Sequence, residues 1–263
     1  MRKIISFDTF NKKKLKWSSS LNNDLKVKRL SKALYVAADK HNFCYLHSWL
    51  GEPMLQTPDD IITIQEIMFK TKPDVVIEVG VAWAGTLLLY ETLAEFTKTK
   101  KIIGIDIFIP KDLKKRIFSK KKTNKIKLIS GNSTSEAIFK RLKKICGSYN
   151  NILIHLDSNH TKEHVLKEIE LYSKLIKKNN YLIVGDTIIE HIPKQKHRKR
   201  EWGKGNNPAN AITEFLKKNK NFKIDKKINF KQLLTNNPNG YLKRIRQLKI
   251  IYSIYNFINF FFF

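Results

Sequence analysis

The sequence predicts an α/β fold in which a doubly wound, mainly parallel sheet carries helices on both faces. The first observation is a short apolar, β-branched run at residues 75–79, which is typical of a strand buried on both faces. The second is that short apolar runs alternate with helix-length stretches from there to residue 186. Together they indicate a Rossmann-like sheet, preceded by a helical extension at the N-terminus.

Apolar runs and turn signals place the remaining strands and helices. After Thr161, apolar residues recur with helical spacing at Val165, Ile169, Tyr172 and Ile176, which indicates an amphipathic helix. The predicted strands are 75–79, 102–107, 126–130, 152–157 and 180–186, with weaker ones near 222–230 and 240–244. The predicted helices are 85–97, 134–145, one from about Thr161, and 208–218.

The first fifty residues are predicted to precede the sheet. Residues 1–30 are rich in Lys, Ser and Asn, which is typical of a loosely attached arm. Apolar residues recur between Leu30 and Leu50, which predicts a helix followed by an irregular turn. Thr57 is expected to be the N-cap of a further helix, with Pro58 at its first position. We therefore divide the chain into an arm and helix at 1–50, a main domain at 51–245 and an apolar, aromatic tail at 246–263.

Two acids and two glycines lie where the first two strands end. Gly80 and Gly85 allow the chain to turn sharply into a helix that begins near Thr86, which leaves free N–H groups beside the strand end. Glu78 is near the end of the first strand, and Asp106 ends the second, where one carboxylate can accept hydrogen bonds from both hydroxyls of a ribose. A nucleoside-bearing cofactor is therefore predicted at this edge.

The glycine spacing indicates which cofactor. The turn lacks the G-x-G-x-x-G of dinucleotide sites, which disfavours NAD-dependent oxidoreduction. From Glu78 to Gly85 it reads Glu-x-Gly-x-x-x-Ala-Gly, the looser loop common in methyltransferases that use S-adenosylmethionine (SAM), a sulfonium cofactor with no pyrophosphate. The alternative is an ordinary turn between strand and helix with a chance acid.

Two further carboxylates and an imidazole follow the next two strands. Asp157 and His160 come after the strand at 152–157, and Asp186 ends the strand at 180–186. Hard oxygen ligands suit Mg²⁺, which one or two carboxylates often hold. His160 is then placed to remove a proton from a metal-bound hydroxyl. The alternative is that Asp157 caps the following helix and His160 only packs at its start.

The turn after the third strand offers a further contact to the cofactor. Asn132 and Ser133 belong to a Gly-Asn-Ser-Thr cluster, which this fold places near the adenine side. Capping of the next helix is the simpler interpretation of these residues.

A long basic loop is predicted between 187 and 207. It contains Lys194, Lys196, His197, Arg198, Lys199 and Arg200. A connection of this length inside a compact domain is more often a lid or a binding loop than filler.

Composition limits the function classes. The 263 residues carry a formal net charge of +28, which invites a nucleic-acid interpretation because clustered cations release counterions from phosphate. The lysines are spread through nearly every segment, however, and no nucleic-acid motif is visible, so we expect no specific nucleic acid partner. Cys44 and Cys146 are too few for a disulfide framework, and the N-terminus shows no signal-peptide pattern. These features fit a cytoplasmic protein.

The last segment, 244–263, is basic and then strongly apolar. Ser253, Asn256 and Asn259 interrupt it, so that a transmembrane helix is not predicted. The order of basic and aromatic residues fits an anchor at the inner membrane surface, and docking on the chain's own domain or on a second subunit of a homo-oligomer fits equally well.

Ordered motifs across residues 45–244 resemble the cephalosporin hydroxylase family, which includes rhamnosyl O-methyltransferases. They are Gly51-x-Pro-x-x-Gln56, Lys72-Pro-Asp-x-x-Ile-Glu-x-Gly80, Gly104-x-Asp106, Gly131-Asn-Ser133, Leu156-Asp-Ser-x-His160, Tyr181-Leu-Ile-Val-x-Asp-Thr187 and Asn237-Pro-x-Gly-Tyr-Leu-Lys-Arg244. The resemblance implies a class I SAM-dependent methyltransferase domain at 51–245 with a divalent metal beside the cofactor. Related macrolide-sugar O-methyltransferases are similar in placing a histidine three residues after the first metal aspartate, as Asp157 and His160 do.

Two positions depart from the family pattern. The family usually has Glu-Asp at the end of the fifth strand, whereas here Gly185 precedes Asp186, so that one expected metal carboxylate is missing. Glu190, in the loop just beyond, is a candidate substitute. The family's paired glycines are Ala84 and Gly85 here, which tightens the cofactor loop.

The first functional hypothesis is a SAM-dependent O-methyltransferase that acts on a sugar hydroxyl of a glycolipid, an O-antigen or another polysaccharide precursor. Asp157, Asp186 and Mg²⁺ are expected to fix the hydroxyl, and His160 is expected to remove its proton. The second hypothesis is a basic scaffold that contacts nucleic acid. The third is an inactive family member that binds SAM as a membrane-associated partner in polysaccharide assembly, which Gly185 and the tail suggest.

Overall fold

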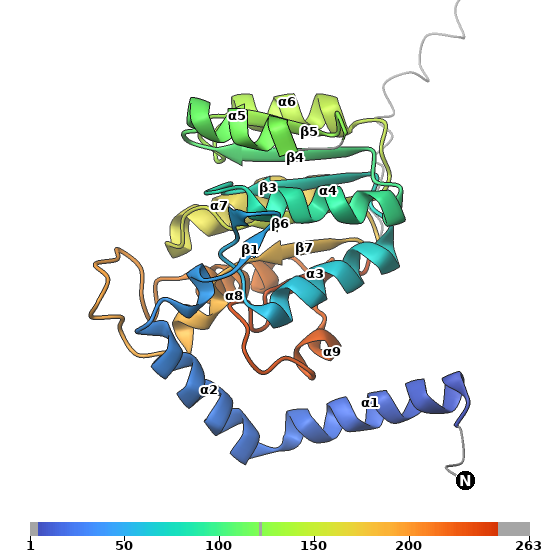
Figure 1. The fold of residues 1–263 in the computed structure, drawn as a ribbon, viewed down its shortest axis with the longest axis vertical. Coiled ribbons are helices and arrows are strands. Elements are labelled where there is room, and N and C mark those ends of the chain that lie inside the picture. The colour runs from blue at the N-terminus through green and yellow to red at the C-terminus, as the bar shows by residue number, and fades with distance from the viewer. Residues whose placement is uncertain (1–4, 121–122, 247–263) are drawn as a thin grey trace, which may run out of the picture.

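The fold is organised around a mixed seven-stranded sheet. The computed structural model describes residues 5–120 and 123–246, and in this part the strand order is β5-β4-β3-β6-β7-β9-β8 (Figure 1). The strands are β3 (Val75–Val79), β4 (Lys101–Asp106), β5 (Ile126–Ser130), β6 (Ile152–Leu156), β7 (Tyr181–Val184), β8 (Phe222–Ile224) and β9 (Tyr241–Arg244). Neighbouring strands from β5 to β7 are parallel, and β9 runs antiparallel to both β7 and β8. The predicted fold class is confirmed.

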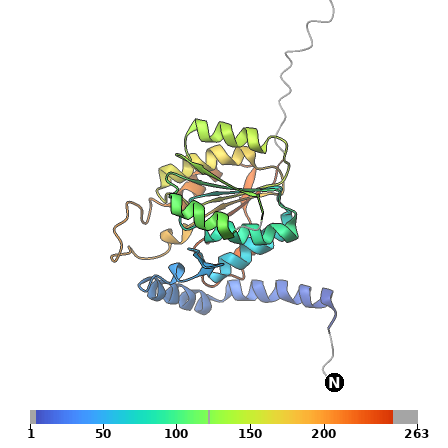
Figure 2. The same cartoon turned by 45° about the horizontal axis from the view of Figure 1, so that its top comes forward.

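Helices cover both faces of this sheet and enclose two apolar cores. Figure 2 shows the sheet edge-on, with α3, α4 and α5 below it and α6 and α7 above it. The bounds are α3 (Pro58–Thr71), α4 (Gly85–Thr97), α5 (Lys111–Lys120), α6 (Glu136–Cys146), α7 (Lys162–Tyr172) and α8 (Pro208–Lys218). One core joins alternate strand residues to α6, α7 and α8, and the other joins the remaining strand residues to α3, α4 and α5. Because both faces are buried, the central strands are mainly apolar, as in Val75–Val79, where Glu78 is the single charged residue.

Residues 7–39 form two helices, whereas a helix was predicted only after residue 30. Helix α1 (Phe7–Asn23) begins after Ser6, whose hydroxyl accepts from the Thr9 N–H, and α2 (Leu25–Asp39) begins after Asp24, whose carboxylate accepts from the Val27 N–H at 3.0 Å. The lysines between these caps are good helix formers, which the compositional argument overlooked. Helix α1 buries none of its residues.

Three further elements differ from the prediction. Helix α5 was not predicted. Its segment is rich in lysine, and only Leu113 and Ile117 are buried, so the sequence offers few apolar residues from which a helix could be recognised. The strand predicted at 222–230 is limited to β8, and the short helix α9 (Lys226–Asn229) follows it. A small hairpin, β1 (Ser48–Trp49) and β2 (Glu52–Pro53), and three 3-10 turns at 43–45, 173–175 and 187–190 complete the described elements.

The parallel register brings the functional edge together. Glu78 pairs with Gly104 of β4 on one side and with His155 of β6 on the other. The ends of β3, β4, β6 and β7 therefore meet at one edge of the sheet. None of the described helices is both long and apolar enough to cross a membrane. The tail predicted at 246–263 lies outside the described residues except for Arg246.

Candidate active site

Glycine at position 80 lets the ends of β3 and β6 approach each other. Gly80 has φ +93°, and a Cβ placed on it would lie 2.1 Å from the carbonyl oxygen of Asp157. A Cβ on Gly85 would lie 2.4 Å from the carbonyl oxygen of Pro53. Any side chain at either position would therefore push apart the segments that surround the predicted cofactor loop.

Glu78 is buried beneath this loop, with 2% of its surface exposed. The Thr86 hydroxyl is a hydrogen-bond partner of its carboxyl group, and its Oε2 has no partner among the described residues. Burial raises the pKa of Glu78 well above its usual range, and the nearby charge of Asp157 raises it further. A buried acid with a free oxygen is suited to a cationic ligand or to a hydrogen-bond donor.

Asp106 holds the loop from the neighbouring strand. Its Oδ2 accepts the backbone N–H of Val81 at 2.8 Å and that of Ala82 at 3.3 Å, and its Oδ1 accepts from the Phe108 N–H at 3.3 Å. Asp106 was predicted to bind a ribose, and in the structure its carboxylate also fixes the turn after β3. It lines a cavity beside Asn132 and Ser133.

Asn132 and Ser133 lie in that cavity's wall, but neither caps the next helix. The N-cap of α6 is Ser135, and Asn132 turns its side-chain oxygen to the Thr134 N–H at 2.9 Å. The Ser133 hydroxyl donates to Glu168 at 2.5 Å. The fully buried Glu168 of α7 also accepts from the Ser158 hydroxyl at 2.7 Å, which ties the loops after β5 and β6 to this helix.

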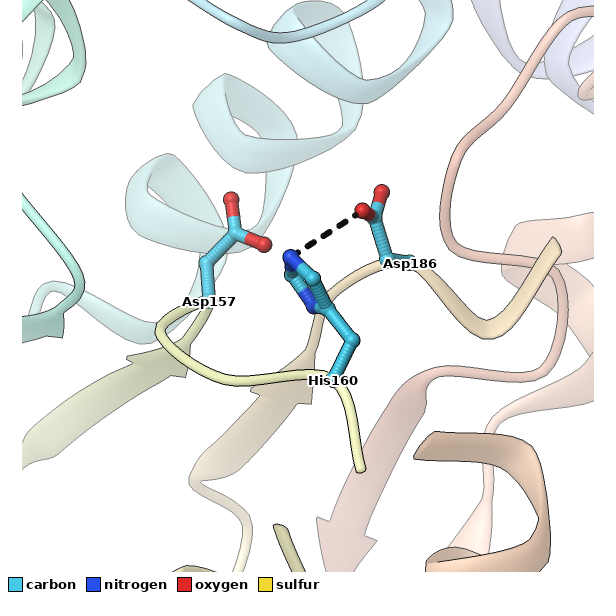
Figure 3. Close-up of side chains that lie close together, drawn as sticks. All are labelled: Asp157, His160 and Asp186. Atoms are coloured by element: carbon cyan, nitrogen blue, oxygen red, sulfur yellow. Dashed lines mark ion pairs between the residues drawn. The ribbon is translucent and has the colours of Figure 1, made fainter. Parts of the chain in front are cut away.

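Asp157, His160 and Asp186 form a cluster with the geometry of a metal site (Figure 3). One ligand atom from each residue lies within 4.8 Å of the others, and His160 Nε2 is 3.4 Å from Asp186 Oδ2. Gln56 Nε2 donates to Asp157 Oδ2 at 2.9 Å. Asp157 does not cap the following helix, because the N-cap of α7 is Thr161.

The electrostatics of this edge favour a bound cation. Burial raises the pKa of Asp157 well above its usual range, and the charges of Asp186 and Asp60 raise it further. Among the described residues, no lysine or arginine forms an ion pair with Glu78, Asp157 or Asp186. Two carboxylates that lie this close together fit Mg²⁺ or a similar divalent ion, and the imidazole of His160 lies beside them.

The structure explains why residue 185 is glycine. A Cβ on Gly185 would lie 2.3 Å from Oδ1 of Asp157, so that a glutamate here would displace the first metal carboxylate. Glu190 does not replace the missing acid. Its carboxylate accepts from the Gly205 N–H at 2.9 Å and from Asn207 Nδ2 at 2.6 Å, and so anchors the base of the long loop. The third residue of the cluster is His160.

The loop between Thr187 and Asn207 covers the cluster on one side. Trp202 packs edge-on against His160, with 4.7 Å between ring centroids. Farther out, the loop is tied to Asp39 at the end of α2, which accepts from Gln195 Nε2 at 2.6 Å and from Arg198 Nη2 at 2.9 Å. The roles of Trp202 and Asp39 were not predicted, because their partners are distant in sequence and no local pattern marks them.

Two adjoining cavities complete the site. The larger one, of about 440 Å³, is lined by Asp106, Asn132 and Ser133 and suits a nucleoside. The smaller one, of about 110 Å³, is lined by Glu78, Gly85, Thr86, His160 and Asp186. Gly80, Asp157 and Trp202 line both. An elongated ligand with a nucleoside at one end and a cation at the other fits these residues, as SAM would.

This sheet order and this site define a SAM-dependent methyltransferase. The family model described as "Rhamnosyl O-methyltransferase/CmcI" matches residues 41–245. The chain belongs to this family, as its motifs predict. It is similar to the rhamnosyl O-methyltransferase of Mycobacterium leprae (strain TN), with 28% identity over 166 residues that cover 60% of this chain and 70% of the relative. The rhamnosyl O-methyltransferase of Mycobacterium tuberculosis (strain ATCC 25618 / H37Rv) is 26% identical over 218 residues, which cover 80% of this chain and 85% of the relative.

Solved structures agree on the fold. An apo structure of CmcI superposes with a TM-score of 0.55 at 17% identity and covers 77% of each chain. A structure of CmcI with Mg and SAM superposes with a TM-score of 0.53 at 17% identity and covers 77% of this chain and 78% of the CmcI chain. At this identity the likeness concerns the fold alone.

Proposed function

We propose that this enzyme uses SAM and Mg²⁺ to methylate a sugar hydroxyl of a glycolipid, an O-antigen or another polysaccharide precursor. The observation that carries the proposal is the convergence of Asp157, His160 and Asp186 beside the cofactor loop. The names of the curated relatives support a sugar acceptor. The CmcI structure with Mg and SAM supports the pairing of cofactor and metal.

Glu78 and Asp106 would hold the two ends of the cofactor. Asp106 would accept from the ribose hydroxyls, and the free oxygen of Glu78 would accept from the ammonium group of the methionine part. Thr86 would contact the same end through the first turn of α4. This placement directs the methyl group toward the cavity that His160 lines.

Asp157 and Asp186 would hold the metal, and His160 would act as the base. Bound SAM supplies an activated methyl group, and a bound divalent ion lowers the pKa of the acceptor hydroxyl. His160 would then accept the proton at Nε2, and Asp186, 3.4 Å away, would stabilise the imidazolium. The protein's contribution is mainly positioning, because an in-line transfer depends on the alignment of both substrates.

Further parts of the proposal concern organisation and place in the cell. The catalytic domain is proposed to span 51–245, with 1–50 as an N-terminal extension and 246–263 as a tail that contacts the inner membrane surface or a second subunit. A cytoplasmic enzyme at that surface would meet lipid-linked acceptors. The tail's composition supports this part of the proposal.

The test is to separate binding from turnover. His160→Ala should leave SAM affinity within about twofold and should lower turnover by roughly 10²–10⁴, the usual contribution of a general base. His41→Ala is the matched control, since His41 is exposed and lines neither cavity. Equal losses of SAM binding and of turnover in His160→Ala would count against its role as base.

A further inference from the structure

Two arginines of the long loop line the smaller cavity, and their surroundings differ. Arg198 is held on several sides: its Nη2 donates to Asp39 Oδ1 at 2.9 Å, to the Asp39 carbonyl oxygen at 3.1 Å and to Asn42 Oδ1 at 2.9 Å. Its guanidinium also lies over the Tyr45 ring, 4.9 Å from the centroid. Arg198 is therefore a structural cation that fastens the loop to the end of α2.

Arg200 has a different environment. Its guanidinium lies over the indole of Trp202, 5.1 Å from the centroid, and its Nη2 is 3.5 Å from the Tyr45 hydroxyl. Within residues 5–120 and 123–246, no carboxylate forms an ion pair with it. The side chain is exposed and lines the smaller cavity. Stacking on the indole holds the guanidinium in place while most of its N–H donors stay open for a ligand.

A continuous row of side chains connects Arg200 to the metal cluster. Arg200 stacks on Trp202, and Trp202 packs edge-on against His160 at 4.7 Å. All three line the smaller cavity. A sugar whose hydroxyl reaches His160 would therefore bring the rest of the same unit, or the unit next to it, toward Arg200.

The charge distribution fixes where an anionic group can lie. Glu78, Asp157 and Asp186 line the same cavity, but they are the groups proposed to hold the cofactor and the metal, and their oxygens offer no donor to an anion. The loop at the mouth carries additional exposed lysines, Lys194, Lys196 and Lys199, which form no ion pair within the described part of the chain. These cations favour the approach of an anion from the side of this loop.

We propose that Arg200 forms an oxyanion subsite, so that the preferred acceptor is a sugar that carries a carboxylate or a phosphate beside the methylated unit. This inference rests on the proposed function and adds the acceptor's charge to it. Arginine suits the task because its planar fork binds both oxyanions through two parallel hydrogen bonds, which a lysine cannot reproduce.

The probes are three sugars with the same ring: methyl glucoside, methyl glucuronoside and glucose 1-phosphate. Each is titrated calorimetrically at constant ionic strength into the full chain, with and without S-adenosylhomocysteine and Mg²⁺. At least one anionic sugar should bind about tenfold or more tightly than methyl glucoside, the usual effect of a charge-assisted hydrogen bond. Preference for the glucuronoside would identify a carboxylate source, and preference for the 1-phosphate would identify a phosphate source.

Variants assign the effect to one side chain. Arg200→Gln should abolish the preference while leaving methyl glucoside binding unchanged, and Arg200→Lys should restore only part of it. Lys196→Gln is the matched control, because it removes one charge from the same loop at a residue that does not line the cavity. Equal binding of all three sugars, or an equal loss in Lys196→Gln, would overturn the inference.

The same titrations distinguish a failure of this inference from a failure of the proposed function. SAM that binds while the sugars show no charge preference would reject the subsite alone. If SAM fails to bind, the proposed function falls, and the titrations without cofactor still show whether Arg200 selects anionic sugars.

Discussion

At the residue scale, the position of Asp157 is the most constrained feature of the site. Its backbone passes against Gly80, and its side chain passes against Gly185, so that two glycines make room for one aspartate. Gln56 donates to its Oδ2 at 2.9 Å and fixes the direction of the carboxylate. The absence of a side chain at 185 therefore preserves the metal cluster, where sequence comparison with the family had indicated a loss.

Gly185→Ala tests this interpretation. Because the added Cβ would collide with Oδ1 of Asp157, Mg²⁺ affinity and turnover should each fall by roughly 10–100-fold, the usual effect of disturbing the support of a metal ligand. Metal titration of the SAM complex is the measurement. Gly203→Ala is the control, since a Cβ there meets nothing within 4 Å. Mg²⁺ affinity that stays unchanged in Gly185→Ala would show that Asp157 does not hold the metal.

Asp60 is the buried carboxyl group that joins α3 to the segment before β9. Its oxygens accept from the hydroxyls of Thr57, Thr235 and Tyr241 and from the Asn236 N–H. Burial nevertheless raises its pKa to about 6, above the ordinary 3.8. Between these two values the folded state holds a proton that the unfolded state has lost, so that stability should fall as the pH rises through this window.

The pH dependence can be isolated with Asp60→Asn, which does not titrate. As the pH falls from 7 to 4, the free energy of unfolding of the natural chain should rise relative to that of the variant by up to about 3 kcal/mol. Urea unfolding of both chains across this range is the measurement. A difference that does not change with pH would show that the pKa of Asp60 is not raised by folding.

The residues that could be predicted are those that local pattern marks. Gly80 and Asp106 stand out because they follow apolar strands, and parallel topology then places them at one edge. The structure places Asp157, His160 and Asp186 together at the same edge. Tyr35, Asp39 and Trp202 could not be predicted, because their places in the site depend on how the N-terminal helices and the long loop fold back over the sheet.

At the element scale, the loop from 187 to 207 lies beside the Asp157, His160 and Asp186 cluster and is held by hydrogen bonds at two places. Glu190 binds Gly205 and Asn207 at its base, and Asp39 of α2 holds Gln195 and Arg198 farther along. In Figure 1 the loop projects beyond the sheet on the side where α2 ends. This attachment holds the loop against α2, whose Tyr35 and Asp39 line the smaller cavity together with Arg198 and Trp202.

Asp39→Ala should release the outer part of this loop. The loss of a charge-assisted hydrogen bond to Arg198 is expected to increase loop opening roughly tenfold. Trypsin should then cleave the loop about tenfold faster, and the KM for the acceptor should rise while SAM affinity changes little. Asp8→Ala, an exposed position in α1, serves as control. Cleavage at the natural rate in Asp39→Ala would mean that Asp39 does not hold the loop.

The central strands were predicted from the sequence, whereas helices α1 and α5 were not, and the difference has a physical reason. The central strands are mainly apolar because both faces are covered, and such runs are visible in the sequence even where Glu78 or His155 interrupts them. Helix α1 buries no residue and α5 buries only two, and polar and charged residues dominate both sequences, so that their few apolar residues were not recognised as helical stripes. The lysine content of both helices and the N-cap Ser6 of α1 were the available signals.

At the scale of the whole molecule, the surface and the site have opposite charge. The chain carries a net charge of +28, whereas four carboxyl groups, those of Glu78, Asp106, Asp157 and Asp186, converge at the cofactor edge. A cationic cofactor and a metal ion would neutralise the interior, and a basic exterior attracts anionic acceptors or anionic surfaces. The same division of charge supports both the proposed methyl transfer and the oxyanion subsite at Arg200.

The most direct test of the central claim is calorimetric titration of the full chain with SAM, in Mg²⁺ and in EDTA, with and without a sugar acceptor. We predict roughly micromolar binding of SAM, weakened in Glu78→Gln, and a Mg²⁺ effect on acceptor binding that disappears in Asp157→Asn. Absence of SAM binding under every condition would contradict the account, because the carboxyl edge of the sheet would then not be a cofactor site.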